Sequence, residues 1–319
     1  REEDRFKDLP FLMITAEVEE GTVAESIEAE VDGYILKPFV PRTLEEKMTE
    51  IMTRKLVPSP VETHLRVAEV HLKAGQWEKA HVELDEATKI GPRNPKLHYL
   101  RGLVFEAQGD LEEAEKAFTR ARQSGPKFIK AHEKLADLYA RQGRHGEMLG
   151  VLKEAVRVSP KNADRQTRLG EALLADGRVQ EAKKAFTTAL EIDPDNPSRM
   201  TAIGEAYLAN GLAQEAEKAF KASIDNDPAN IYVYNRLGIA FRRQKKFDEA
   251  IANYHKALAL DPDEENLHYN LARAYLGAGK RHEAVHSLVK ALELRPEFHE
   301  AQALLYKIQD TDQAGPADE

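Results

Sequence analysis

The chain has 319 residues, of which 32% are charged, and its formal net charge is −9. The first 57 residues contain 8 basic and 14 acidic side chains, so the rest of the chain is nearly neutral and does not favour nucleic acid or an anionic membrane as a partner. The absence of cysteine excludes disulfides and is typical of a reducing compartment, so we expect a cytoplasmic protein without a membrane span.

Residues 1–57 predict a strand, a helix, a second strand and a second helix. The apolar runs at 9–16 and 33–39 are typical of buried parallel strands, and residues 18–29 between them have helical spacing. The segment Thr43-Leu44-Glu45-Glu46 is a capping box, with threonine as the N-cap and Glu46 three residues later. It predicts that the second helix begins at Thr43 and ends near Lys55.

The phrase Leu-Pro…Ile-Thr-Ala, followed by Asp-Gly-Tyr-Ile-Leu-Lys-Pro-Phe, resembles the second half of a bacterial response-regulator receiver domain, which has a flavodoxin-like α/β fold. The resemblance implies that Thr15 is the switch hydroxyl, that Tyr34 is the aromatic that changes rotamer, and that Lys37 bridges to the phosphoaspartate. It also implies a cis Lys37–Pro38 bond. Glu30 departs from the family pattern, which usually has glycine before the second strand.

The resemblance also shows which parts of a receiver domain to look for upstream. The family's phosphoacceptor aspartate and its acidic metal-binding pair lie on strands that precede this segment. We therefore expect no cofactor in this chain, and magnesium and a histidine kinase partner only for a complete receiver domain. A truncated chain, a cleaved chain and a vestigial receiver all stay open. A half-domain exposes apolar faces, so we expect a homodimer through residues 1–57 or a missing companion fragment.

Residues 58–60 form a short, stiff linker, after which a proline recurs every 34 residues. The prolines are Pro92, Pro126, Pro160, Pro194, Pro228, Pro262 and Pro296. A fixed period of this length predicts a solenoid of helix–turn–helix repeats. When the first repeat is counted from Val61, seven repeats fill residues 61–298.

Other positions recur with the same period. Position 8 of each repeat is small: Ala68, Gly102, Ala136, Gly170, Gly204, Gly238 and Ala272. Position 24 is large: Leu84, Phe118, Leu152, Phe186, Phe220, Tyr254 and Leu288. Small residues let two antiparallel helices approach, and large ones fill the neighbouring holes. Position 15 is glycine, which ends the first helix in a left-handed conformation, except that Lys245 replaces it in the sixth repeat.

This pattern resembles the tetratricopeptide repeat. It predicts a mainly α fold, an α–α superhelical solenoid that follows the partial receiver domain. Residues 299–309 have the pattern of an additional amphipathic helix that covers the last repeat, and residues 310–319 have the composition of a disordered tail. In this family, positions 2, 5, 6 and 9 of each first helix line a concave groove.

Two motifs that suggest catalysis are better explained by the repeat. His282-Glu283-Ala284-Val285-His286 matches the H-E-x-x-H zinc-protease signature, but Glu-Ala recurs at the same two positions in other repeats. Gly277-Ala278-Gly279-Lys280 lacks the first glycine of a phosphate-binding loop, and Gly279 is the turn glycine of the repeat. We predict no catalytic residues and no metal site, and we expect a protein that is not an enzyme.

The groove is the better candidate for a functional site. Position 6 is basic in four of the seven repeats, and an acidic residue three positions later would pair with Arg66, Lys134 and Arg168 within their own helices. Arg236 and Arg273 lack such a partner. We predict that an acidic or carboxyl-terminal peptide binds this end of the groove. The candidate residues are Tyr232, Asn235, Arg236, Asn266, Tyr269, Asn270 and Arg273.

Two functions follow from these observations, and both stay open at this point. The first is a response regulator of two-component signalling whose output is a protein-interaction scaffold. The second is a structural assembly scaffold whose receiver domain no longer switches. An acceptor aspartate upstream of residue 1 would favour the first, and its absence would favour the second.

Overall fold

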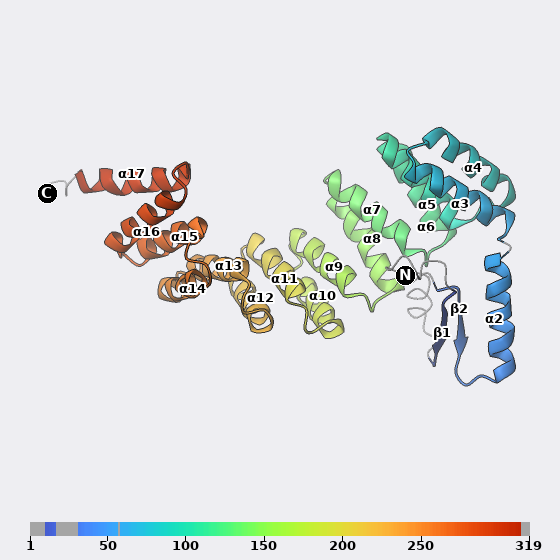
Figure 1. Ribbon diagram of the computed structural model, residues 1–319, viewed down its shortest axis with the longest axis horizontal. Coiled ribbons are helices and arrows are strands. Elements are labelled where there is room, and N and C mark those ends of the chain that lie inside the picture. Colours follow the sequence, from blue (N-terminus) through green and yellow to red (C-terminus); the bar gives the residue numbers. More distant parts are fainter. Residues whose placement is uncertain (1–9, 17–30, 57, 314–319) are drawn as a thin grey trace. The chain divides into compact units, whose positions relative to one another are not determined.

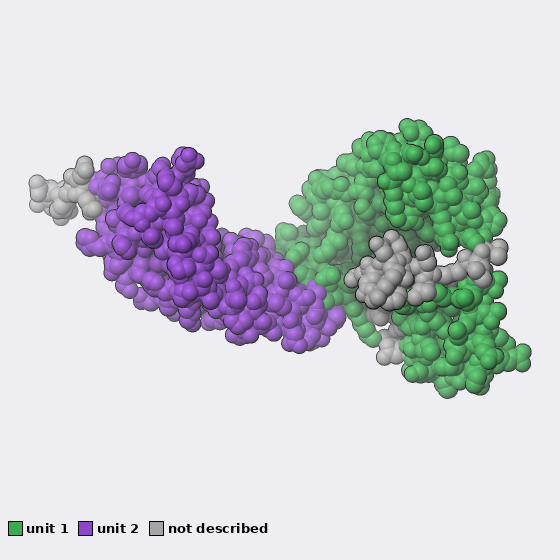
Figure 2. Space-filling view, viewed as in Figure 1, with its two compact units in different colours: residues 1–185 green, residues 186–319 purple. Residues whose placement is uncertain are grey.

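The computed structural model describes residues 10–16, 31–56 and 58–313 and divides into two compact units, residues 1–185 and 186–319 (Figure 2). The described part contains two strands and sixteen helices, so the fold is mainly α, as predicted (Figure 1). The elements are β1 (Leu12–Thr15), β2 (Gly33–Leu36), α2 (Pro41–Leu56), α3 (Pro60–Lys73), α4 (Trp77–Ile90), α5 (Pro95–Gln108), α6 (Leu111–Ser124), α7 (Ile129–Arg141), α8 (His145–Val158), α9 (Ala163–Ala175), α10 (Val179–Ile192), α11 (Pro197–Ala209), α12 (Ala213–Asn226), α13 (Ile231–Arg243), α14 (Phe247–Leu260), α15 (Glu265–Gly277), α16 (Arg281–Leu294) and α17 (His299–Gln313).

The two strands form a parallel pair in which Met13 lies opposite Tyr34 and Ile14 lies opposite Ile35. Helix α2 packs on one face of this pair, where Ile35 and Ile51 are both buried. Tyr34 points to the other face, because successive strand residues alternate between faces, and it is 43% exposed. The helix predicted at residues 18–29 lies outside the described residues.

The predicted start of the helix after β2 was wrong. Helix α2 begins at Pro41, so Thr43 lies inside the first turn and its backbone N–H donates to the Val40 carbonyl (3.0 Å). Proline is favoured at the first helical position because its φ angle is preset and its missing N–H is not needed there. The preference for Pro41 at the first helical position therefore outweighed the capping box, which favours a helix start at Thr43. The Lys37–Pro38 bond is cis, as the receiver resemblance implied.

The repeats fold as fourteen helices, two for each repeat, from α3 to α16. Each first helix ends one or two residues before position 15, where six glycines have φ between 68° and 84°. Lys245 occupies the same position in the sixth repeat and has a φ of 60°, although it is not glycine. The repeat geometry therefore forces a lysine into a backbone conformation that normally favours glycine.

Positions 8 and 24 are matched in size within each repeat. A Cβ atom added to Gly204 would lie 2.5 Å from Cε1 of Phe220, and one added to Gly102 would lie 2.5 Å from the ring of Phe118. Where position 8 is alanine, position 24 is leucine, as in Ala68 and Leu84. Each repeat thus fills one hole with either a glycine and an aromatic ring or an alanine and a leucine.

Helix α17 covers the last repeat, as the sequence predicted. Phe298, Ala301 and Ile308 are buried in one cluster with Leu288 and Ala291 of α16. The helix runs to Gln313, so the predicted start of the tail at residue 310 was wrong. The amphipathic pattern is shorter than the helix because its last turn adds only polar residues.

Candidate peptide-binding groove

The first helices of repeats six and seven, α13 and α15, lie side by side in the second compact unit (Figures 1 and 2). These two helices bring together the candidate residues predicted from the sequence, but one of the two arginines predicted to lack an acidic partner has one. Arg236 is not uncompensated: its guanidinium forms a two-pronged ion pair with Glu205 of α11. Glu205 also accepts a hydrogen bond from the Tyr232 hydroxyl (2.9 Å). Arg236 and Tyr232 therefore belong to a contact between repeats five and six.

The other predicted ion pairs within single helices were also wrong. Arg168 pairs with Asp137 of the preceding repeat (2.5 Å), and Lys134 pairs with Glu106 of the preceding repeat (2.9 Å). Position 6 of one first helix faces the previous first helix, so its partner is about 30 residues away in sequence rather than three. These pairs join neighbouring repeats across the groove.

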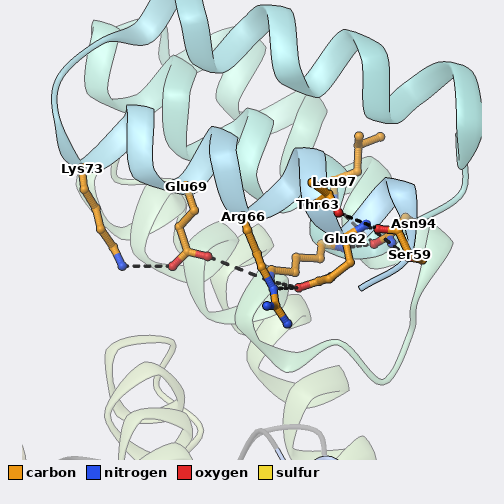
Figure 3. A network of polar contacts seen from close by, with 9 residues as sticks. Ser59, Glu62, Thr63, Arg66, Glu69, Lys73, Asn94 and Leu97 are labelled. Carbon is orange, nitrogen blue, oxygen red and sulfur yellow. Dashed lines mark hydrogen bonds and ion pairs between the residues drawn. The ribbon is translucent and has the colours of Figure 1, made fainter. Parts of the chain in front are cut away.

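Arg66 in the first repeat has no preceding repeat to pair with. Its Nε donates to Glu62 (3.3 Å), one helical turn earlier, rather than to Glu69. Figure 3 shows that Glu69 instead faces Lys73, at 3.1 Å. Both pairs are partly exposed, so each contributes at most a few tenths of a kcal/mol to about 1 kcal/mol.

Arg273 differs from these residues. Its side chain is exposed and has no ion pair with any residue that the structure describes. The guanidinium lies over the ring of Tyr269, with Cζ 5.7 Å from the ring centroid. A cation on an aromatic face is held in position without being neutralised. Arg273 therefore has no acidic partner among the described residues, and its role in binding stays a prediction.

A second uncompensated arginine, Arg242, lies on α13 and was missed in the sequence. Its Nε is buried without a hydrogen-bond partner in the described chain, and it forms no ion pair there. Burial lowers the pKa of its guanidinium, and repulsion from Arg273 lowers it further. The sequence contains a signal for this residue, since arginine at position 12 departs from the leucine that four other repeats have there (Leu72, Leu174, Leu208 and Leu276).

The hydroxyl of Tyr254 lies between these charges. The side chain is fully buried, and its oxygen makes no hydrogen bond of regular geometry with the described residues, although it lies close enough to Arg242 for a polar interaction. Burial raises the pKa of this phenol to about 12, against the opposing charges of Arg242 and Arg273.

The asparagines of the groove are partly engaged with one another. Asn270 donates from Nδ2 to Oδ1 of Asn235 (3.0 Å), which leaves the Asn270 carbonyl and the Asn235 amide available to a peptide backbone. Asn266 is less available: it donates to Glu264 (2.7 Å) and accepts from Arg295 (3.5 Å), which directly follows α16.

We define the basic groove as Asn235, Arg242, Tyr254, Tyr269, Asn270 and Arg273. It combines two cations that lack carboxylate partners with amides and aromatic rings. Guanidinium groups form strong charge-assisted bonds with carboxylates, and amides can bond an extended backbone. The arrangement suits an acidic peptide.

The switch residues inferred for the receiver domain lie close together at one end of the strand pair. The backbone N–H of Lys37 donates to the Thr15 carbonyl (2.7 Å), which places the two residues side by side after their strands. Thr15 pairs with Leu36, two residues beyond Tyr34, so Thr15 and Tyr34 point to the same face. Their roles in phosphorylation stay a prediction.

The H-E-x-x-H segment lies in α16, with His282 and His286 one turn apart. In the part of the chain that the structure describes, no set of three or more histidine or acidic side chains is placed to hold a metal ion. None of the helices in that part is both long and apolar enough to cross a membrane.

Comparison with known proteins identifies the family of the repeats. Models of the tetratricopeptide repeat match residues 65–127, 133–197, 173–237 and 265–298, and a TPR repeat model matches residues 240–279. Together these matches cover more than half of the chain. The chain therefore belongs, in its repeat region, to the tetratricopeptide-repeat family.

Two solved structures share the fold. The C-terminal part of a TPR repeat-containing protein from Cytophaga hutchinsonii superposes with a TM-score of 0.59 at 15% identity, over 75% of this chain and 98% of that one. A tetratricopeptide repeat protein from Parabacteroides merdae gives a TM-score of 0.50 at 20% identity, over 78% of this chain and 99% of that one. At these identities the likeness shows the fold alone.

A second similarity is to chemotaxis proteins. The chain is 43% identical over 54 residues to chemotaxis protein CheY of Pseudomonas aeruginosa, which is 17% of this chain and 44% of that protein. It is 46% identical over 54 residues to chemotaxis protein CheY-3 of Vibrio cholerae, covering 17% and 42% of the two chains. The chain thus spans less than half the length of these relatives.

Proposed function

We propose that the protein is an interaction scaffold that binds an acidic peptide segment of a partner protein in the basic groove. The observation that carries the proposal is the pair Arg242 and Arg273, two guanidinium groups that have no carboxylate partner among the described residues, whereas Lys134, Arg168 and Arg236 are paired with acids. Binding rather than catalysis is the proposed activity.

The same chain carries features of a receiver domain, and we propose that the scaffold is the output of a two-component response regulator. The 54 residues shared with the CheY proteins fit the segment before residue 65, at which the repeat-model match begins. The parallel strand pair and the shared face of Thr15 and Tyr34 support this assignment. Tyr34 and Leu36 are exposed, which supports a companion fragment or a second copy on that face.

Peptide binding is tested by fluorescence anisotropy. The probe is a fluorescein-labelled decapeptide of alternating glutamate and alanine, and the comparison peptide has glutamine in place of glutamate. We expect binding of the acidic peptide only, weakened by added salt because exposed charges are screened within about 10 Å at 0.1 M. Arg273→Gln removes a charge-assisted bond worth about 1.5–3 kcal/mol, which is roughly a 10- to 150-fold loss of affinity.

Two further variants sharpen the test. Arg242→Gln is expected to weaken binding by a similar factor, and its folding is checked by circular dichroism because Arg242 is partly buried. Arg66→Gln is the matched control, since Arg66 lies in the first repeat and is already paired with Glu62. Equal affinity for the two peptides, or an equal loss in the Arg66 control, would refute the site.

A further inference from the structure

A pocket of about 480 Å³ lies among α14, α15 and α16, away from the basic groove. It is lined by His255 and Leu258 of α14, by His268, Leu271 and Tyr275 of α15, and by His282, Glu283, His286, Ser287 and Lys290 of α16. On α15, His268 and Tyr275 lie on the side of the helix opposite Tyr269 and Arg273, because the helix advances 3.6 residues per turn. The pocket and the basic groove are therefore separate sites on two faces of one helix.

The charged and titratable groups of the pocket are mostly bases. Four imidazoles and the ammonium of Lys290 face one carboxylate, that of Glu283, and the phenol of Tyr275. His255 contacts the Tyr275 hydroxyl through Nε2 (2.9 Å), and His268 contacts the Pro262 carbonyl through Nε2 (2.8 Å). His282 and His286 are exposed and have no hydrogen-bond partner within the described residues. These two imidazoles are thus the groups most available to a ligand, whereas the Lys290 ammonium already contacts a carboxylate of Glu293 (3.3 Å) in a partly exposed ion pair.

Two chemistries use several imidazoles in one pocket, metal binding and anion binding. Metal binding needs three or four converging ligands, and the described residues contain no such set. Anion binding needs only that imidazoles are protonated, which imidazoles as a class undergo between pH 5 and 8. The remaining walls, Leu258 and Leu271, are apolar, and the volume lies within the range of about 300–1,000 Å³ that is usual for small-molecule sites.

We propose that this pocket binds a small organic anion, with its carboxylate or phosphate group held by His282, His286 and Lys290 and its apolar body against Leu258 and Leu271. Binding is expected to strengthen as the pH falls below neutral, because imidazoles as a class gain positive charge there. The acids that oppose this charge among the described residues are Glu283 and Glu293, the partner of Lys290. The site does not depend on the basic groove, so it can be occupied whether or not a peptide is bound there.

The experiment uses the full chain and two probes, benzoate and phenyl phosphate, followed by NMR of the histidine ring signals at pH 5.8 and pH 8.0. We expect saturable shifts of the His282 and His286 signals at pH 5.8 and at least tenfold weaker binding at pH 8.0. The stronger of the two probes identifies the head group as a carboxylate or a phosphate. No saturable shift with either probe, or equal affinity at both pH values, would overturn the proposal.

Three variants separate the site from general effects. The double variant His282→Gln, His286→Gln is expected to lose at least tenfold in affinity at pH 5.8, whereas His145→Gln, an exposed histidine on α8, is expected to lose none. His286→Lys keeps a positive charge at both pH values, so it is expected to restore binding at pH 8.0. If the chelator-treated protein instead takes up Zn²⁺ at His282 and His286 and neither anion binds, the pocket is a metal site and the proposal is wrong.

Discussion

The contact between Gly204 and Phe220 gives the sharpest test of how the repeats pack. Gly204→Ala places a methyl group 2.5 Å from the Phe220 ring, closer than two carbon atoms can approach. Overpacking of this kind costs about 1–3 kcal/mol, and the better helix propensity of alanine offsets about 1 kcal/mol of that loss. Phe220→Leu leaves a void in a fully buried site and is expected to cost about 1–3 kcal/mol.

The double variant Gly204→Ala, Phe220→Leu recreates the alanine–leucine pair found in repeats one, three and seven. We expect it to be more stable than the sum of the two single effects by about 1–2 kcal/mol, since each substitution relieves the defect of the other. Urea unfolding and hydrogen exchange of the α11 and α12 amides measure the effect, because a repeat array need not unfold in a single step.

A matched control removes the contribution of helix propensity. Gly150 also lies inside a helix, α8, but an added Cβ would meet nothing within 4 Å. Gly150→Ala is therefore expected to stabilise the chain by about 0.5–1 kcal/mol. Strict additivity of the Gly204 and Phe220 substitutions, or a gain at Gly204 equal to that at Gly150, would refute size matching between positions 8 and 24.

Two further predictions concern stability. Lys245→Gly relieves a left-handed φ of 60° and is expected to raise stability by about 1 kcal/mol, whereas Gly211→Lys is expected to cost about the same; urea midpoints of both variants test this. Burial favours protonation of Glu217, but hydrogen bonds from Lys221 and Lys246 lower its pKa from the ordinary 4.5 to about 2. Its ionised form stabilises the fold above pH 4.5, and this contribution is lost as the pH falls towards 2. Glu217→Gln should therefore be about 1.5–3 kcal/mol less stable than the parent chain at pH 7, and it should lose less stability between pH 4.5 and 2 in acid titrations. An unchanged loss of stability over this pH range would contradict the prediction.

The repeat architecture could be predicted almost completely because its determinants are local and periodic. Proline at position 32 and glycine at position 15 fix the helix ends through backbone geometry, and each effect depends on the residue itself rather than on distant contacts. Lys245 is an exception to this local rule: because the neighbouring repeats fix the turn, a lysine adopts the left-handed φ that glycine has in the other repeats. The start of α2 was misjudged for a similar reason, because two local signals, Pro41 and the Thr43 capping box, competed within three residues.

The charges of the groove could not be assigned from local spacing because the solenoid pairs residues of adjacent repeats. A basic residue at position 6 lies closer to an acid of the previous first helix than to the acid three residues ahead, as Arg168 and Asp137 show. Applied along the chain, this pairing explains why Arg236 is neutralised by Glu205. In the seventh repeat the corresponding residue is Asn270, and position 9 of the sixth repeat is apolar, so the series of pairs ends there. Arg273 stands at position 9 of the seventh repeat, where four of the other repeats have an acid, and this interruption of the pairing coincides with the part of the groove in which we propose that a peptide binds.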